Sequence, residues 1–466
     1  MINLVSMNNL KYNHEQEDPN QMDSQMETDL QSELLSTLEE SRILAKENPV
    51  EYLPELASQL FVFSYSVDYI DRQQAIAELY ECLRKFYRLF IDGHDCLSVI
   101  KSTVFNIAQL EAEGYFELNE CFDKVYSDEI VYLSNLANEN KACLSLVAFM
   151  LLIRYRRPEF LDSDVDKILE SQKEAIAIFE NSQSENKIDF RLPMAETCFN
   201  IAECTLLKYP ETFYVKTEQA EDIFACDITV AIDYAYKALT LFSELFAEGK
   251  TACQMEIAGI YKFLASLYIK KQESIYLELK RLGLQETAMD PKQDVWTVRK
   301  EKRKQIAECE QKIKLFYEDA IKILSDLETD DNEILDKLAD IYKKYADYYR
   351  LTDTSMGISL CQKAIDIYEK MSENSSEYLS NYAWAYNCLF RLFETEYYTK
   401  EQNNQCQSDR LADYISKQEQ VLIKIIEIYK KKHLADEDDD DLRFIEEAYE
   451  ALEKFYKKHP PVPPNL

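Results

Sequence analysis

The residue types that most often carry catalysis or bind metals are few in this sequence, and they are scattered. The four histidines, His14, His94, His433 and His459, lie far apart, and neither an HExxH motif nor a His–Cys ligand spacing occurs. Six isolated glycines cannot build a GxxxxGKS/T or GxGxxG phosphate loop, and no GxSxG nucleophile elbow is present. The sequence therefore predicts no catalytic residue, no cofactor and no metal site.

Carboxylates are the abundant side chains that could take part in catalysis. The chain holds 86 Asp and Glu residues, so any given pair of acids is expected by chance. A hydrolase that uses only carboxylates would also need a pocket, which a stack of helices does not obviously supply. We keep such an enzyme as a minor alternative.

The net charge of −33 bears on the choice of partner. A field of this sign repels phosphate backbones and anionic lipid, which disfavours nucleic acid and membrane surfaces as partners. The simplest interpretation is that the charge keeps the protein in solution. The alternatives are a surface that attracts a basic partner and a mimic of a polyanion.

Two charged runs stand out against this background. Arg299–Lys304 carries five positive charges just after Trp296, a pattern that could contact nucleic acid or an acidic peptide. We interpret it as the solvated face of a long helix that pairs with neighbouring acids. Asp436–Asp441 precedes the last expected helix, Leu442–Lys458, where acids complement the helix dipole. A metal or polybasic binding site is the alternative for this acidic run.

A repeated apolar pattern predicts how the chain folds. A small or apolar residue is followed by a second one seven positions on and by an aliphatic or aromatic cluster that ends eleven positions on. These offsets place the side chains on one stripe of a helix. The clear copies begin at Ala75, Ile168, Ala231, Ile313 and Gly357, and weaker copies begin at Cys121 and Gln418.

Each copy is preceded by another helical segment, so the repeating unit is a helical hairpin. The preceding segments are 53–70, 96–113, 142–156, 192–208, 252–271, 332–350 and 377–398. Gly93 and Gly249 follow second helices, where a left-handed cap favours glycine. Stacked hairpins would bury one continuous core, so we expect an all-α fold of about seven hairpins and a C-terminal capping helix.

The domain organisation follows from this pattern. Residues 1–30 have neither a signal-peptide core nor a basic flank, and we expect an acidic disordered arm there. Residues 31–459 are expected to form the α-solenoid, with insertions near 210–227, 272–311 and 399–409. Residues 460–466, with the sequence PPVPPNL, are expected to form an extended tail. No window of 18 apolar residues occurs, and the twelve cysteines lack a CxxC pair, which favours reduced thiols in a cytoplasmic protein.

The first unit resembles a known repeat family. Asn48-Pro49, Tyr52-Leu53-Pro54 and Leu56-Ala57, followed by Gln74-Ala75-Ile76 and Phe86-Tyr87, are similar to the long tetratricopeptide repeat of about 42 residues found in bacterial proteins and kinesin light chains. The likeness extends in weaker form to 192–246 and 332–368. It implies a right-handed superhelix of stacked antiparallel hairpins whose first helices line a concave groove that takes up a peptide or a helix.

The resemblance also implies which side chains face that groove. They lie between the core positions of the first helices, around Ser64, Ala108, Ala202 and Ala346. The aromatic members would be anchors, unless they pack against the next hairpin, and Lys343 and Arg350 could hold a carboxylate. The candidate groove residues are Phe61, Tyr65, Asp68, Phe105, Gln109, Phe199, Glu203, Lys343, Asp347 and Arg350.

The sequence thus favours a non-catalytic scaffold that binds a protein or peptide partner. A sensor whose helical stack closes on a small peptide or nucleotide and thereby controls an effector is the alternative.

Overall fold

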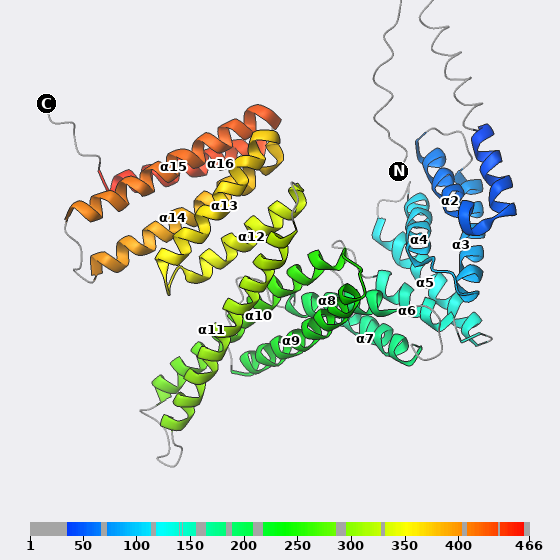
Figure 1. Cartoon of the computed structure of the whole chain (residues 1–466), viewed down its shortest axis with the longest axis horizontal. Helices are drawn as coiled ribbons and strands as arrows, with labels where there is room; N and C mark the ends of the chain where they lie inside the picture. The colour runs from blue at the N-terminus through cyan, green and yellow to red at the C-terminus, as the bar shows by residue number, and fades with distance from the viewer. Residues whose placement is uncertain are drawn as a thin grey trace, which may run out of the picture. The chain divides into compact units, whose positions relative to one another are not determined.

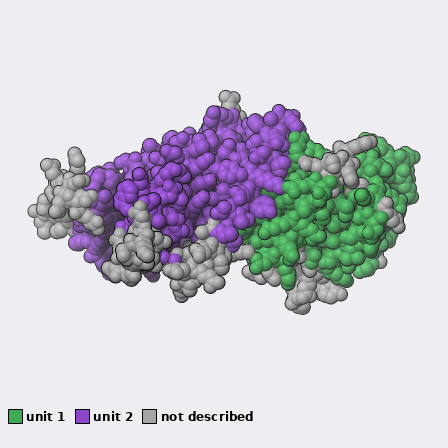
Figure 2. Space-filling view, turned by 90° about the horizontal axis from the view of Figure 1, so that it is seen from below, with its two compact units in different colours: residues 1–207 green, residues 208–466 purple. Residues whose placement is uncertain are grey.

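The computed structural model describes residues 35–66, 72–112, 118–138, 140–141, 143–154, 165–182, 189–207, 218–285, 295–327, 331–402, 408–436 and 439–460. Within these ranges the chain is helical and contains no strand, so the expectation of an all-α fold is confirmed (Figure 1). The chain divides into two compact units, residues 1–207 and 208–466 (Figure 2). The expected amino-terminal arm and residues 461–466 of the tail lie outside the described residues. A single solenoid over 31–459 stays a prediction.

Unit 1 is a series of helices that each pack on the next one along the chain. Additional contacts join α2 to α4, the first helices of two successive hairpins, and α3 to α6. After a helix over 35–47, the elements are α2 (Pro49–Ser66), α3 (Arg72–Ile91), α4 (Leu97–Ala112), α5 (Leu118–Ala137), α6 (Cys143–Arg154), α7 (Val165–Ser182) and α8 (Arg191–Leu207).

The predicted apolar stripe forms the core of this unit. Ala75, Cys82, Leu83 and Phe86 of α3 are all buried. Helix α6 is buried around almost its whole circumference from Cys143 to Ile153, as expected for a helix that packs on α3, α5 and α7. Helical hairpins therefore fold because each stripe is covered by a neighbouring helix.

Unit 2 continues the same plan. Each helix packs on the next, and α12 also packs on α14, its counterpart in the following hairpin (Figure 1). The elements are α9 (Glu218–Ala247), α10 (Cys253–Gln285), α11 (Val295–Asp326), α12 (Asn332–Tyr349), α13 (Thr354–Asn374), the short 3₁₀ helix η3 (Ser376–Tyr378), α14 (Leu379–Gln402), α15 (Ser408–Asp436) and α16 (Asp439–Lys458).

The segments expected near 210–227, 272–311 and 399–409 as insertions fall largely at helix ends. Residues 272–285 extend α10 and residues 295–311 begin α11, so these two helices have 33 and 32 residues. Residues 218–227 begin α9, whereas 399–402 and 408–409 belong to the ends of α14 and α15. Residues 208–217, 286–294 and 403–407 lie outside the described part of the chain.

Helix ends follow the expected capping chemistry. Gly93 and Gly249 have φ values of 97° and 94°, in the left-handed region that glycine adopts without a steric cost. The next residues, His94 and Lys250, donate their amides to Leu89 O at 3.0 Å and Leu245 O at 3.1 Å. This is the bonding of a Schellman cap, which ends α3 and α9.

One residue of the acidic run before the last helix, Asp441, is buried in an ion pair, which the sequence alone did not indicate. Helix α16 begins at Asp439, three residues earlier than expected, so part of the run lies in its first turn. Asp441 is only 2% exposed, and its carboxylate accepts a bond from Lys432 Nζ of α15 at 3.0 Å. This ion pair joins the capping helix to the hairpin below it.

Candidate functional site

Unit 2 contains a groove of about 1070 Å³ that is lined mainly by α10, α12 and α14. Each of these is the first helix of its hairpin, and the second helices α11, α13 and α15 pack against it. The groove therefore lies mainly on the face of the first helices that their own hairpin partners leave uncovered, and Tyr317 of α11 also lines it.

One side of the groove holds a carboxylate surrounded by lysines. The Asp340 carboxylate lies 3.1 Å from Lys343 Nζ, 3.2 Å from Lys262 Nζ and 3.7 Å from Lys344 Nζ. Lys262 comes from α10, whereas the other two lysines share α12 with Asp340. The cluster thus ties two hairpins together.

A second carboxylate, further along α12, is bound by two arginines. Asp347 Oδ1 lies 3.2 Å from Arg350 Nε and 3.4 Å from Arg391 Nη2, and Arg391 belongs to α14. Together the two clusters place five cations around two acids, which leaves a surplus of three positive charges. In a chain whose net charge is −33, this surplus marks a local reversal of sign.

The pKa values of the first cluster reflect this surplus. Burial alone would raise the pKa of Asp340, but Lys344, Lys343 and Lys262 outweigh it and lower that pKa below its ordinary value. The pKa of Lys344 is lowered, first by burial and further by the positive charges of Lys262 and Lys343, although Asp340 opposes the shift. An added anion near Lys344 would relieve that repulsion.

Tyr317 and Tyr348 line the groove, and Tyr345 packs against both. The rings of Tyr317 and Tyr345 stack with centroids 4.7 Å apart, and Tyr348 contacts Tyr345 at 6.5 Å. Burial and then Glu310 raise the pKa of Tyr348 to about 12, so its phenol is neutral at physiological pH. Tyr276 and Trp384 also line the groove and are about half exposed, at 50% and 55%. Exposed aromatic rings are typical anchors at protein interfaces.

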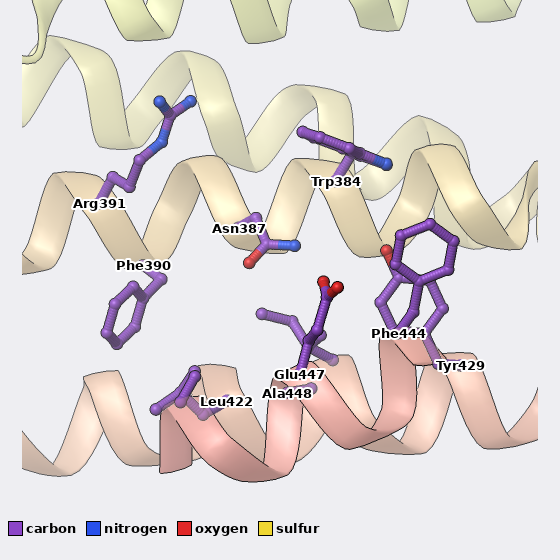
Figure 3. A pocket seen from close by; sticks show the side chains of 11 residues that line it. Trp384, Asn387, Phe390, Arg391, Leu422, Tyr429, Phe444, Glu447 and Ala448 are labelled. Atoms are coloured by element: carbon purple, nitrogen blue, oxygen red, sulfur yellow. The ribbon is translucent and has the colours of Figure 1, made fainter. Parts of the chain in front are cut away.

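A smaller cavity of about 470 Å³ lies between α14, α15 and α16. Its lining is mostly apolar and includes Phe390, Leu422 and Phe444. Figure 3 shows Phe390 and Asn387 pointing from α14 toward α15 and α16, whereas Arg391 projects from the opposite side of α14. Trp384 and Arg391 line both cavities.

The groove contains three of the residues singled out from sequence. Lys343, Asp347 and Arg350 all line it. That a partner binds there stays a prediction.

The remaining candidates belong to unit 1. Phe61 lies on α2, Phe105 and Gln109 on α4, and Phe199 and Glu203 on α8. The ring of Phe105 lies 5.6 Å from that of Phe122 on α5, so it packs against the second helix of its own hairpin.

Two further unit 1 candidates are described incompletely. Tyr65 belongs to α2, but its side chain is outside the described part, as is the whole of Asp68.

Sequence reasoning missed the contributions of α10 and α14. On α12 the groove residues lie three positions before, one after and four after Ala346. The same offsets around Asn387 give Trp384, Cys388 and Arg391, all of which line the groove. Around Ile269 they give Ser266, Lys270 and Glu273, which do so as well. Small residues mark the predicted register, and neither Asn387 nor Ile269 is small.

The basic run Arg299–Lys304 lies near the start of α11. Lys302 forms an ion pair with Glu278 of α10, and Lys304 Nζ lies 3.7 Å from Glu308. Lys300 Nζ lies 5.3 Å from the centroid of the Trp296 ring, which is 69% exposed. These contacts fit the interpretation of a solvated helix face that pairs with nearby acids.

The described residues also bear on other kinds of site. No group of three or more His, Cys, Asp or Glu side chains there is arranged to hold a metal ion. None of the described helices has both the length and the hydropathy that crossing a bilayer requires. The ten cysteines whose side chains are described are free thiols, and all but Cys226 are buried.

Comparison with known proteins adds little to this geometry. No family model and no curated protein sequence matches the chain. Among solved structures, the chain is similar to a "circular tandem repeat protein with novel repeat topology and enhanced subunit contact surfaces", with 13% identity over 93% of this chain and 91% of that one. The TM-score of that match is 0.19, which is too low to transfer either a topology or a function. The helical-repeat character of the protein therefore rests on its own packed helices.

Proposed function

We propose that this protein is a non-catalytic interaction scaffold that binds a peptide or protein partner in the groove of α10, α12 and α14. The observation that carries the proposal is the local surplus of positive charge beside half-exposed aromatic rings, contributed by three successive first helices. Charged groups that fix register, next to aromatic anchors, are the usual elements of a peptide-binding groove.

The groove acids support a binding role over a catalytic one. Asp340 is held ionised by three lysines, whereas a general acid requires a raised pKa. Asp347 is shared between two arginines. Both carboxylates therefore act as positioning groups that hold the cations at the groove surface.

Helical hairpins with a first-helix groove also support assignment to the tetratricopeptide type, which is a proposal about ancestry rather than about partner. Free, mostly buried thiols support a reducing compartment such as the cytoplasm. The excess of negative charge over the whole chain favours a protein partner over nucleic acid or a membrane surface.

Affinity capture from a lysate of the native host tests the proposal. The full chain and a variant that carries Lys343→Glu and Arg350→Glu are immobilised in equal amounts, and the captured proteins are quantified by mass spectrometry. We expect at least one protein that the wild type retains and the variant loses, because both substitutions reverse charge at the groove.

A charge-matched control separates the groove from general electrostatics. Lys454→Glu and Lys457→Glu change the net charge equally but lie on the exposed face of α16, where the two lysines pair with Glu450 and Glu453 of the same helix. This control should retain the partner. Recovery that is the same for all three proteins, with circular dichroism showing intact helices, would exclude the groove as the binding surface.

A further inference from the structure

The pocket beside the groove has a feature that a simple capping helix does not require. Helix α16 covers α15, yet it leaves a cavity of about 470 Å³ between itself, α14 and α15. The rings of Tyr429 and Phe444 stack at one end of it, with centroids 5.3 Å apart. Small side chains, Ala448 and Ala451, line it from α16 and keep it open.

This pocket and the groove share two lining residues on α14. Trp384 and Arg391, two turns apart on α14, line both cavities. A ligand that follows α14 would therefore contact the cations and the apolar pocket together.

The chemistry of the two parts differs, which specifies the ligand. The groove has surplus positive charge around Asp340 and Asp347, and two of its cations are well exposed, Lys344 at 47% and Arg391 at 52%. The pocket is lined by aromatic and aliphatic side chains and has one acid, Glu447. Acidic groups on the ligand fit the first part, and a large apolar side chain fits the second.

The spacing of the two parts follows from helix packing. Helix α12 packs directly on α14. Packed helices lie about 8–10 Å apart, so roughly one such spacing separates the cations of α12 from Trp384 and Arg391 of α14, which also line the pocket. An extended chain covers that distance in about three residues, at about 3.3 Å per residue.

We infer that α16 completes a two-part site for an extended acidic peptide segment. In this site, Asp or Glu side chains of the peptide contact Lys344 and Arg391. A large apolar side chain about three positions away enters the pocket between α14, α15 and α16. This inference rests on the proposed function and specifies its partner. A nucleic acid strand fits less well, because a continuous row of phosphates would run past Asp340, Asp347 and Glu273, whereas a peptide can leave those positions uncharged.

Selection from a phage library of random linear dodecapeptides, with the full chain as bait, tests the inference. We expect enrichment of peptides that carry at least two acids and one large apolar residue about three positions from them. The best synthetic peptide should bind more weakly as salt is raised, since exposed charges are screened.

Variants assign each half of the peptide to its subsite. Ala451→Trp fills the pocket, and it should abolish the preference for an apolar residue and reduce affinity about 10-fold or more, as for loss of a buried anchor. Lys344→Glu with Arg391→Glu should abolish the preference for acids. Glu450→Trp adds the same bulk to the exposed face of α16 and should select the same peptides as the wild type.

Three results would overturn the inference. They are selection of no peptide or of peptides without acids, an unchanged preference in the Ala451→Trp variant, and binding of a 20-nucleotide poly-uridine probe as tight as that of the best peptide. None of these results contradicts the scaffold proposal, which is tested separately. That proposal stands if the variant with Lys343→Glu and Arg350→Glu no longer captures a host protein that the wild type captures.

Discussion

Gly357 of α13 lies close to both α12 and α14. A methyl group on its Cα would lie 2.9 Å from the carbonyl oxygen of Ala346 on α12 and 2.7 Å from Leu392 Cδ2 on α14. Leu392 can change rotamer, but the Ala346 carbonyl belongs to the helix backbone and moves only with α12. Gly357→Ala therefore has to push α13 away from α12.

Two opposing effects set the size of this change. Alanine is favoured over glycine inside a helix by about 1 kcal/mol. Adding a methyl group to a packed interface costs about 1–3 kcal/mol when neighbours must shift. Since one of the two close atoms is backbone, we expect the second effect to exceed the first, with a net loss of up to about 2 kcal/mol.

Gly259 provides a matched control in the same unit. It lies inside α10, and a methyl group there would meet no atom within 4 Å. Gly259→Ala should therefore show the helix-propensity gain alone, a stabilisation of about 0.5–1 kcal/mol.

Thermal unfolding followed by circular dichroism measures both variants. For a unit of this size, 1 kcal/mol corresponds to a shift of about 2–4 °C in Tm. We expect Tm to fall for Gly357→Ala and to rise for Gly259→Ala. Equal shifts of the same sign in both variants would refute the explanation, because helix propensity alone would then account for both.

Three further predictions concern other parts of the chain. Glu129→Ala leaves Arg84 without its buried partner in unit 1, and urea unfolding should show a loss of about 3 kcal/mol or more, whereas a loss below about 1 kcal/mol would mean that this pair is dispensable. Asp340→Asn should lower the free energy of unfolding at pH 7. Because the folded-state pKa of Asp340 lies below its ordinary 3.8, this loss relative to wild type should shrink as pH falls below about 4. A loss that stays constant with pH would contradict the lowered pKa. Maleimide at pH 8, followed by peptide mapping, should label exposed Cys226 well before Cys82, whose pKa burial raises to about 11; equal labelling would contradict the burial.

Most of the helical plan was accessible from local sequence. The apolar stripe that begins at Ala231 becomes the buried face of α9, and the stripe at Gly357 that of α13, because a period near 3.6 residues can be satisfied only by a helix with a neighbour. Helix starts and ends agree with expectation within a few residues for most first helices. The chief difference is α10, which continues to Gln285 because no glycine or proline interrupts it after Lys271 until Gly283.

The candidate site was only partly accessible. Lys343, Asp347 and Arg350 were found because α12 carries a small residue, Ala346, that marks the register of the groove. Trp384 and Arg391 occupy equivalent positions on α14, but Asn387 replaces the small residue there and hides the register.

Hairpins, their order and their buried stripes follow from the sequence alone, since each depends on contacts within about one helical repeat. The groove depends on groups that are distant along the chain. Lys262 pairs with Asp340, which is 78 positions away in the sequence. Arg391 of α14 pairs with Asp347 of α12. No local pattern encodes such pairs, because the positions of charges on different helices become related only when packing brings α10, α12 and α14 together. That is why the sequence indicated a binding scaffold, while only the tertiary structure revealed a cationic groove within an acidic protein.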